Sequence, residues 1–331
     1  MTDETAILKN QYINKININD YNLLQTIGTG AYGKVRLTRN KKTGRTYALK
    51  ILKKADIIRM KQVDHVFNEY IIISQIYHPF IVEFRGASLI DPVYLYLLTE
   101  FIPGGELFTL LKSKEYFPIE QAKFYAAHIV TIFEYLHKKK IIYRDLKPEN
   151  ILINFNGYLK LTDFGFAKII NKEMTYTLCG TPEYIAPEII ANKGHSFPVD
   201  WWTLGIFLYE MIVGVVPFTD NDPLNLYQQI LKCKVKFPKN MNKEARSLIK
   251  HLLIVDISRR YGCLKNGIRD IIEHKFFNGF DWKSLLFKTM KAPFIPDVKN
   301  WVDSSNFNYY PNSEDDNQIA LPHDKDPFIN W

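Results

Sequence analysis

The densest group of chemically capable side chains lies between Tyr143 and Asn150, in the run Tyr-Arg-Asp-Leu-Lys-Pro-Glu-Asn. Asp145 and Lys147 place a carboxylate and an ammonium two residues apart, and Asp163 follows at the head of Asp-Phe-Gly. Phosphoryl transfer needs a carboxylate beside the attacking hydroxyl and hard oxygen ligands for Mg²⁺. The spacing therefore predicts Asp145 as the base, Asn150 and Asp163 as metal ligands, and Lys147 as a cation that offsets charge on the transferred group.

A second chemical feature is the glycine-rich run Gly28-Thr29-Gly30-Ala31-Tyr32-Gly33. Its spacing is shared by phosphate-covering loops and by dinucleotide-binding turns. A dinucleotide-binding turn would open a helix, whereas residues 34–38 alternate as a strand does. The pattern favours a hairpin whose backbone amides cover phosphates, and a plain glycine hairpin is the alternative.

Lys50 lies in an otherwise apolar predicted strand, where an unpaired ammonium would be costly to bury. Glu69, on the next predicted helix, can pair with it and leave the ammonium facing the α- and β-phosphates of ATP. A purely structural ion pair is the alternative interpretation.

Holding these side chains requires a strand-rich region followed by a helix-rich one. Period-two patterns and glycine-bearing turns come first, and helical periodicity begins after Pro103-Gly104-Gly105. A run that is apolar almost all round and stops at Gly214 predicts a helix buried in the second region. The predicted elements are a short amphipathic helix in the first 20 residues, strands at 23–24, 35–38, 46–52 and 93–101, helices at 62–76, 125–136 and 201–213, and an extended surface tail over the last 40 residues.

Composition narrows the class of protein. The chain has 331 residues, of which 47% are hydrophobic, so it can bury a large core and form two lobes. Three scattered cysteines suit neither a disulfide framework nor a zinc site, which favours a cytosolic or nuclear compartment. No apolar run approaches the roughly 20 residues of a membrane span, and neither a secretory leader nor a myristoylation glycine is present, so no stable membrane anchor is expected. The lysines behind the net charge of +8 are dispersed, so nucleic-acid binding is not expected.

With Leu178–Tyr184, Ala186-Pro187-Glu188 and Phe294-Ile295-Pro296 added, these motifs make the chain similar to protein kinases. Within the AGC group it resembles the catalytic subunits of cyclic-AMP-dependent protein kinases, from about Tyr21 to the C-terminus. The resemblance implies a bilobal α+β fold, with a small antiparallel β-rich lobe carrying one key helix, a larger mainly helical lobe, and a tail along both. The implied boundaries are 1–20 for an N-terminal extension, 21–102 for the ATP-binding lobe, 103–277 for the catalytic and substrate-binding lobe, and 278–331 for the tail.

The resemblance also implies an activity and partners. The implied enzyme is a serine/threonine protein kinase that uses ATP with two Mg²⁺ ions, for which Mn²⁺ can substitute. Its protein substrates would carry arginines two and three places before the acceptor. A cyclic-nucleotide-binding regulatory subunit, docking near Tyr176 and Tyr227, would hold it inactive. The alternatives are another AGC-group kinase, such as a cyclic-GMP-dependent one, and a nucleotide-binding pseudokinase scaffold, which the intact Lys50, Asp145 and Asp163 disfavour.

The nucleotide contacts of the family map onto both predicted lobes. Thr99 would be the gatekeeper before a hinge at 100–102, and its small side chain is expected to open a pocket behind adenine, although an ordinary core threonine is the alternative. The implied nucleotide-binding residues are Gly28, Thr29, Gly30, Ala31, Tyr32, Gly33, Val35, Ala48, Lys50, Thr99, Glu100, Ile102, Glu106, Lys147, Glu149, Asn150, Leu152, Thr162, Asp163 and Phe307.

Thr177 is the implied activation-loop phosphosite, modified by an upstream kinase or by autophosphorylation. The family places His65, Arg144 and Lys168 as cations around its phosphate. His65 and Glu69 share a helix face at i, i+4, so holding His65 would also position Glu69. An exposed loop hydroxyl and a surface histidine are the alternatives.

The remaining implied roles concern substrate binding and bracing; ordinary surface glutamates are the alternative for the acidic residues, and ordinary core residues are the alternative for the spine. Ala320 and Asn308-Tyr309 depart from the family pattern, which puts tail phosphorylation and tail contacts with basic substrates in doubt. The implied residues are Glu106, Glu149, Glu183 and Glu210 for substrate arginines; Leu178, Pro182 and Ile185 for the residue after the acceptor; Glu188 and Arg260 as a buried ion pair; Ile73, Phe84, Tyr143 and Phe164 as an apolar spine; and Phe328 and Trp331 as the hydrophobic motif.

Overall fold

The computed structural model describes residues 15–30, 32–88, 91–170, 174–311, 320–322 and 326–328. The chain divides into two compact units. The first consists of Met1–Gly105, Ile153–Phe155 and Pro296–Trp331, and the second of Glu106–Leu152 and Asn156–Ile295. Each has its own core and is described by itself.

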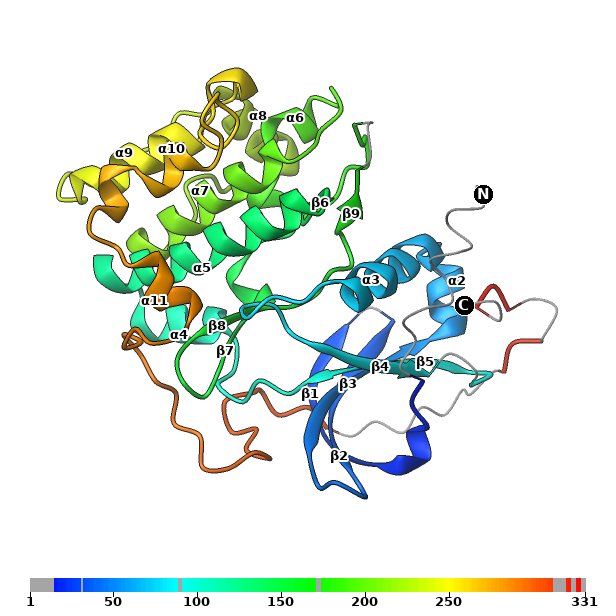
Figure 1. Ribbon diagram of the computed structural model, residues 1–331. Coiled ribbons are helices and arrows are strands. Elements are labelled where there is room, and N and C mark those ends of the chain that lie inside the picture. Colours follow the sequence, from blue (N-terminus) through cyan, green and yellow to red (C-terminus); the bar gives the residue numbers. More distant parts are fainter. Residues whose placement is uncertain are drawn as a thin grey trace. The chain divides into compact units, whose positions relative to one another are not determined.

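A five-stranded antiparallel sheet, in the order β1-β2-β3-β5-β4, frames the first unit (Figure 1). The predicted strands are confirmed. Gly30 pairs with Gly33 across the β1–β2 turn, so the glycine motif forms a hairpin and opens no helix. The strands are β1 (Tyr21–Gly30), β2 (Gly33–Asn40), β3 (Thr46–Lys53), β4 (Phe84–Ser88) and β5 (Tyr94–Glu100).

Two helices follow β3 in the first unit, α2 (Lys54–Arg59) and α3 (Val63–Gln75). The second confirms the helix predicted over 62–76. The first was not predicted, because six residues are too few to show a 3.6-residue period. Both pack into a core that also takes in the tail residue Phe328, and whose buried members are Leu52, Ile57, Val66, Tyr70, Ala87, Leu95, Leu97 and Phe328.

The second unit is mainly helical, as predicted. Its central helix α7 contacts α5 and α9 and is buried over nearly its whole length. At its end Gly214 has a φ of 87°, and an added Cβ would lie 2.2 Å from the carbonyl oxygen of Glu115, so glycine is required there. The longer helices are α4 (Leu107–Lys114), α5 (Ile119–Lys138), α7 (Pro198–Val213), α8 (Pro223–Lys232) and α9 (Lys243–Leu252); the shorter ones are α6 (Pro187–Ile190), α10 (Arg269–Ile272) and α11 (Trp282–Leu286).

Four short strands bracket the segments with the predicted chemistry: β6 (Ile141–Ile142), β7 (Ile151–Ile153), β8 (Leu159–Leu161) and β9 (Lys168–Ile169). β6 pairs with β9, and β7 with β8. The 3₁₀ turn η2 (Pro148–Asn150) lies between β6 and β7, with proline at its first position. The Tyr143–Asn150 segment is therefore fixed at both ends by strand pairing.

The termini match their predictions only where the structure describes them. Residues 292–311, 320–322 and 326–328 contain no helix or strand, as expected for an extended tail. Of the first 20 residues, where a short helix was predicted, 1–14 lie outside the described part, and Ile18–Asp20 form the 3₁₀ turn η1. None of the described helices is long and apolar enough to cross a bilayer.

Candidate active site

Asp145 is buried, with 3% of its surface exposed, and three side chains hold its carboxylate. The amide of Asn150 donates to Oδ2 at 2.7 Å, and the ammonium of Lys147 lies 3.0 Å from the same oxygen. The hydroxyl of Thr181 donates to Oδ1 at 3.1 Å and accepts from Lys147 at 2.9 Å. The carboxylate therefore has one orientation, and Thr181 is a neighbour that the sequence did not assign to it.

The surroundings of Asp145 act on its pKa in opposite directions. Burial raises the pKa of its carboxyl group, while Lys147 and the hydrogen bond from Asn150 lower it. Burial is the largest of these influences, so Asp145 is a stronger base than an exposed aspartate. A carboxylate of this kind can accept the proton of an attacking hydroxyl.

A second buried carboxylate, Asp200 on α7, fixes the backbone just before Asp145. Its Oδ2 accepts from the amide of Tyr143 at 3.0 Å and its Oδ1 from that of Arg144 at 2.8 Å. Nε2 of His137 lies 2.7 Å from Oδ2. Arg144 has a φ of 68°, a conformation that costs free energy for any residue with a Cβ, and the two hydrogen bonds offset that cost. Sequence reasoning missed Asp200; the available signal was a carboxylate near the start of a nearly all-apolar helix.

Asn150 and Asp163 have the donor chemistry that Mg²⁺ requires. The amide nitrogen of Asn150 donates to Asp145, so Oδ1 is the atom of this side chain that can serve as a metal ligand. Asp163 adopts a φ of 57° at the start of Asp-Phe-Gly, and the amide of Gly165 donates to its Oδ1 at 3.3 Å. Within the described residues, no group of three or more His, Cys, Asp or Glu could hold a metal. In nucleotide sites Mg²⁺ is typically bound by one or two protein oxygens together with phosphate oxygens, and Asn150 and Asp163 suit that arrangement.

Lys50 and Glu69, in the first unit, form the predicted ion pair. The ammonium of Lys50 on β3 lies 2.6 Å and 2.8 Å from the two carboxylate oxygens of Glu69 on α3. The Glu69 side chain is 7% exposed and the Lys50 side chain 28% exposed, so the carboxylate is the more enclosed partner of the pair. Binding of phosphates by Lys50 remains a prediction.

The glycines of the β1–β2 hairpin serve different purposes. A Cβ on Gly33 would lie 2.1 Å from the carbonyl oxygen of Ile51, so only glycine lets β2 pack against β3 here. Added Cβ atoms on Gly28 and Gly30 would have their nearest neighbours at 3.7 Å and 3.9 Å. These two positions have no packing reason to be glycine and leave the backbone open to a ligand. Ala31 lies outside the described residues.

The predicted nucleotide contacts divide between the units. Val35, Ala48 and Phe307 pack into one apolar cluster with Phe101, whose ring centroid is 5.8 Å from that of Phe307. Thr99 pairs with Ala48 across β3 and β5. The first unit contains Gly28, Thr29, Gly30, Tyr32, Gly33, Val35, Ala48, Lys50, Thr99, Glu100, Ile102 and Phe307, and the second Glu106, Lys147, Glu149, Asn150, Leu152, Thr162 and Asp163.

Comparison with known proteins settles the family. The model of the protein kinase domain matches residues 21–277. The chain belongs to the protein kinase family. It is 48% identical over 311 residues to the cAMP-dependent protein kinase catalytic subunit PRKX of Mus musculus, a match that covers 94% of this chain and 86% of that protein.

Other relatives of the kinase have similar names. It is 48% identical to the cAMP-dependent protein kinase catalytic subunit of Dictyostelium discoideum, over 90% of this chain and 46% of the relative. It is 44% identical to the cAMP-dependent protein kinase type 3 of Saccharomyces cerevisiae, over 91% and 75%. The chain is thus a serine/threonine protein kinase similar to these catalytic subunits, and the kinase domain implies use of ATP and a divalent metal.

The carboxylates predicted to bind substrate arginines have unequal environments in this kinase. Glu106 is half-buried, and burial together with the nearby Glu149 raises its pKa. Glu149 is exposed and Glu183 is half-buried. Glu210 is buried, and its carboxylate already accepts a hydrogen bond from the hydroxyl of Tyr184. Of the three predicted apolar contacts, Leu178 and Pro182 are exposed and Ile185 is buried.

In the kinase's activation segment, Thr177 is exposed and bonded to none of the cations expected around it. Lys168 donates instead to the hydroxyl of Thr175 at 3.0 Å, and Arg144 donates from Nε to the carbonyl oxygen of Phe166 at 2.7 Å. His65 belongs to the first unit, where its Nδ1 lies 2.6 Å from Oε1 of Gln62.

The structural ion pair of Glu188 and Arg260 is confirmed. The guanidinium makes two hydrogen bonds to the carboxylate, of 2.7 Å and 2.9 Å, and both side chains are buried. Arg260 also donates to the carbonyl oxygens of Pro198 and Ile254. Of the predicted spine, Tyr143 and Phe164 touch within the second unit, with ring centroids 5.3 Å apart.

Phe328 of the hydrophobic motif is 1% exposed and sits in the core with α2 and α3, while its predicted partner Trp331 lies outside the described residues. Sequence reasoning missed a neighbouring ion pair. Lys54 and Asp326 are both buried, and their charged atoms lie 2.6 Å apart.

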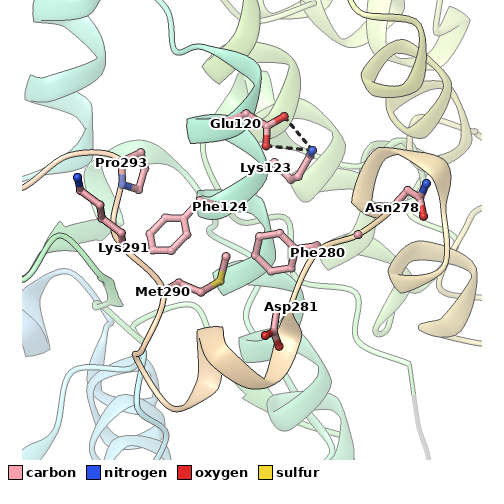
Figure 2. A pocket seen from close by; sticks show the side chains of 10 residues that line it. Glu120, Lys123, Phe124, Asn278, Phe280, Asp281, Met290, Lys291 and Pro293 are labelled. Atoms are coloured by element: carbon pink, nitrogen blue, oxygen red, sulfur yellow. Dashed lines mark hydrogen bonds and ion pairs between the residues drawn. The ribbon is translucent and has the colours of Figure 1, made fainter.

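A surface pocket of the second unit lies between the start of α5 and residues 278–293. Figure 2 shows Phe124, Phe280 and Met290 grouped at its centre, with Lys123 turned towards Glu120. None of the predicted site residues lines this pocket, so it is not assigned to phosphoryl transfer.

Proposed function

We propose that this kinase transfers the γ-phosphoryl group of ATP to serine or threonine hydroxyls that follow arginines in substrate proteins. The observation that carries the proposal is the fixed carboxylate of Asp145, held by Asn150, Lys147 and Thr181 in a buried position. In the proposed reaction Asp145 accepts the proton of the acceptor hydroxyl, and Lys147 offsets charge on the transferred group.

In this proposal Asn150 and Asp163 hold two Mg²⁺ ions. The ions would neutralise negative charge on the phosphates. Lys50 would bind the α- and β-phosphates, with Glu69 keeping its ammonium in place. The open backbone at Gly28 and Gly30 supports phosphate binding by the β1–β2 hairpin.

The proposed lobes have partial support from the division of the chain. The change of unit between Gly105 and Glu106 lies close to the proposed boundary at 102/103. The tail counts with the first unit from Pro296 onward, whereas the proposed boundary lies at 278. Residues 278–295 are therefore better grouped with the catalytic lobe.

The preference for arginine rests on Glu106 and Glu149. Burial and the nearby Glu149 raise the pKa of Glu106, and a guanidinium between the two carboxylates would relieve their repulsion. Replacing the arginines of a substrate peptide with citrulline should raise KM far more than it lowers kcat. A Glu149→Gln variant should lose most of its discrimination between the two peptides, and discrimination equal to wild type would contradict the assignment.

The names of the relatives support a regulatory partner. We propose that a cyclic-nucleotide-binding subunit inhibits the kinase by docking at the surface that includes Tyr176 and Tyr227, of which Tyr176 is exposed. Addition of such a subunit should abolish peptide phosphorylation, and cyclic AMP should restore it. Inhibition relieved by cyclic GMP alone would favour the cyclic-GMP-dependent alternative.

The central test is Asp145→Asn. Without a base, turnover should fall by about 10³-fold, while ATP binding changes little, because the phosphate and adenine contacts remain. Turnover with an arginine-containing peptide and ATP affinity from a fluorescent nucleotide analogue measure the two effects. Wild-type turnover in the variant would remove Asp145 as the base, and no turnover by the wild type would support a pseudokinase.

A further inference from the structure

Three nitrogen-bearing side chains meet behind the activation segment of the second unit: Arg144, Lys168 and His195. Nη1 of Arg144 lies 3.4 Å from Nε2 of His195. The backbones of His195 and Thr175 exchange two hydrogen bonds, of 3.0 Å and 2.8 Å, and the hydroxyl of Thr175 accepts from Lys168 at 3.0 Å. Arg144 and His195 are 6% and 2% exposed. We call these three side chains the basic cluster.

The basic cluster contains no ion pair: within the described part of the chain, neither Arg144 nor Lys168 forms one. Asp200 acts electrostatically on both Arg144 and His195, but its oxygens already accept from two backbone amides and lie beside His137. Cys179 is the other titratable neighbour, and burial raises the pKa of its thiol, which keeps it uncharged. Buried positive charge without a partner is costly, so the cluster is suited to receive an anion.

His195 shows the effect of this uncompensated charge. Burial, Arg144 and Lys168 lower its pKa to about 4, against the weaker opposing pull of Asp200. The imidazole is therefore neutral near pH 7 and accepts a hydrogen bond from Arg144 through Nε2. An anion bound at the basic cluster would make the electrostatic potential at His195 negative instead of positive.

We propose that His195 is a ligand of phosphorylated Thr177: its Nε2 takes up a proton from solvent, loses the hydrogen bond from Arg144 and donates to the phosphate. The proposal rests on the proposed role of Thr177 as the phosphosite. It adds to Arg144 and Lys168 a residue that no sequence pattern assigned, and it couples phosphate binding to protonation.

Strand geometry supports contact between a phosphate on Thr177 and the side chain of His195. Thr175 and His195 are directly opposite in an antiparallel bridge, so their side chains lie on the same face. Thr177 comes two residues after Thr175, and alternate side chains share a face wherever the backbone is extended, so an extended backbone from Thr175 onward would turn Thr177 to this face as well. A phosphate adds about two negative charges and three acceptor oxygens, enough to engage Arg144, Lys168 and a protonated His195 together.

The sign of the pH dependence follows from linkage. The phosphate raises the pKa of His195, so the phosphorylated protein binds a proton that the unphosphorylated protein does not. The stabilisation from the phosphate–His195 contact is present below that raised pKa and is lost as the pH rises through it.

The direct test is to follow the His195 ring by NMR in ¹⁵N-histidine-labelled protein, with and without phosphothreonine installed at position 177 during translation. His195→Gln assigns the resonance, and His251→Gln, a histidine of α9 outside the cluster, is the matched control. The pKa of His195 should be at least about two units higher in the phosphorylated protein. An unchanged titration curve would overturn the proposal.

The unfolding temperature gives a second readout, which also shows whether each variant folds. Phosphorylation of Thr177 should raise the unfolding temperature more at pH 6 than at pH 8 in wild type and in His251→Gln. In His195→Gln that excess at pH 6 should vanish, although the phosphate keeps its own second ionisation near pH 6. An equal excess in both variants would exclude His195 as the ligand. Mass spectrometry of the kinase from its own cells tests Thr177 separately: a missing phosphate there would refute the phosphosite, whatever the installed phosphate does.

Discussion

Asp145 must remain ionised in surroundings whose burial favours its protonated form, and Lys147 is the main influence that opposes burial. Lys147 lies 3.0 Å from the carboxylate and is also bonded to Thr181, which fixes its position. The pH at which the kinase loses its base should therefore depend on Lys147 in addition to Asp145.

Replacing Lys147 with methionine should move the acidic limb of the kcat/KM profile to higher pH by about one unit, as well as lowering kcat. The direction follows because loss of the ammonium raises the pKa of Asp145, so the base is protonated earlier as the pH falls. Peptide phosphorylation between pH 5 and 8 measures the limb. Lys138→Met, which removes an exposed lysine paired with Glu134, should leave it in place. A lower kcat with no movement of the limb would mean that Lys147 does not tune Asp145.

Individual residues were predictable where the side chains that the chemistry requires form a short sequence motif. Asp145, Asn150 and the pairing of Lys50 with Glu69 follow from the need of phosphoryl transfer for a base, metal ligands and a buried ammonium with a partner. Asp200 was not predictable in this way, because its role is to accept backbone amides of a residue with positive φ, and that conformation leaves no mark on the sequence.

At the scale of elements, the tail contributes to the core that supports α3. Lys54, the first residue of α2, pairs with Asp326 at 2.6 Å, and its ammonium lies 5.7 Å from the centroid of the Phe328 ring. α3 carries Glu69, so this contact links the position of the tail to the Lys50–Glu69 pair.

Lys54→Met should destabilise the protein by about 3 kcal/mol, because it leaves the Asp326 carboxylate buried without its cation. The loss of stability cannot exceed the free energy of undocking the tail, since an undocked tail exposes Asp326 to water. Urea unfolding measures the loss, and faster hydrogen exchange in α3 locates it. The double variant Lys54→Met/Asp326→Leu should recover much of the stability. If both variants lose equal stability, the pair contributes nothing specific.

A second part of the tail lies beside the predicted adenine contact. Trp301 packs edge-on against Phe155 at 5.1 Å, its carbonyl oxygen accepts from Thr46 at 2.7 Å, and Asn306 donates to the carbonyl oxygen of Pro103 at 3.1 Å. These contacts hold the chain immediately before Phe307. Trp301 is 63% exposed, so its aromatic pairing is easily removed without opening a core.

Trp301→Ala should raise KM for ATP about fivefold, the equivalent of about 1 kcal/mol, with little change in kcat. The reason is that Phe307 loses part of the support that places it near adenine, while the catalytic carboxylate is untouched. Steady-state kinetics with varied ATP test this, and Trp301→Phe should restore most of the affinity. Tyr309→Ala, which removes an 87% exposed aromatic of the same tail, is the control. Equal effects of the two alanine variants would assign the change to general loosening of the tail.

Elements were predictable in proportion to their length and regularity. The four predicted strands and α3, α5 and α7 have enough residues for a period to be read, but β1 runs six residues past its predicted end, α5 begins six residues before its predicted start, and β4 was not predicted. α2 has six residues and β6 and β9 have two each, so they depend on contacts distant in sequence, such as the pairing of Ile142 with Lys168. The approach of Asp326 to Lys54 joins residues 272 positions apart, which no local pattern can show.

At the scale of the whole molecule, a buried and a half-buried histidine, each with a lowered pKa, make stability depend on pH. Burial and the adjacent His251 lower the pKa of His274, and His195 behaves in the same way while Thr177 carries no phosphate. As the pH falls below about 6.5, the ordinary pKa of histidine, these two histidines bind protons in the unfolded chain while they stay neutral in the folded chain. Folding should therefore lose free energy from about pH 6.5 downward.

His274→Asn should flatten this acid loss of the unphosphorylated kinase between pH 6.5 and 5. His274 accepts from the amide of Phe276 at 3.1 Å through Nδ1 and contacts the Ser247 hydroxyl at 3.1 Å through Nε2, so protonation would forfeit the first bond. Asparagine keeps an acceptor for that amide but does not titrate, so stability at pH 7.5 should change little. The free energy of unfolding in urea at several pH values gives the comparison. Since His195 still titrates in the variant, a reduced slope is expected, and a slope identical to wild type would show that His274 is not a source of the acid sensitivity.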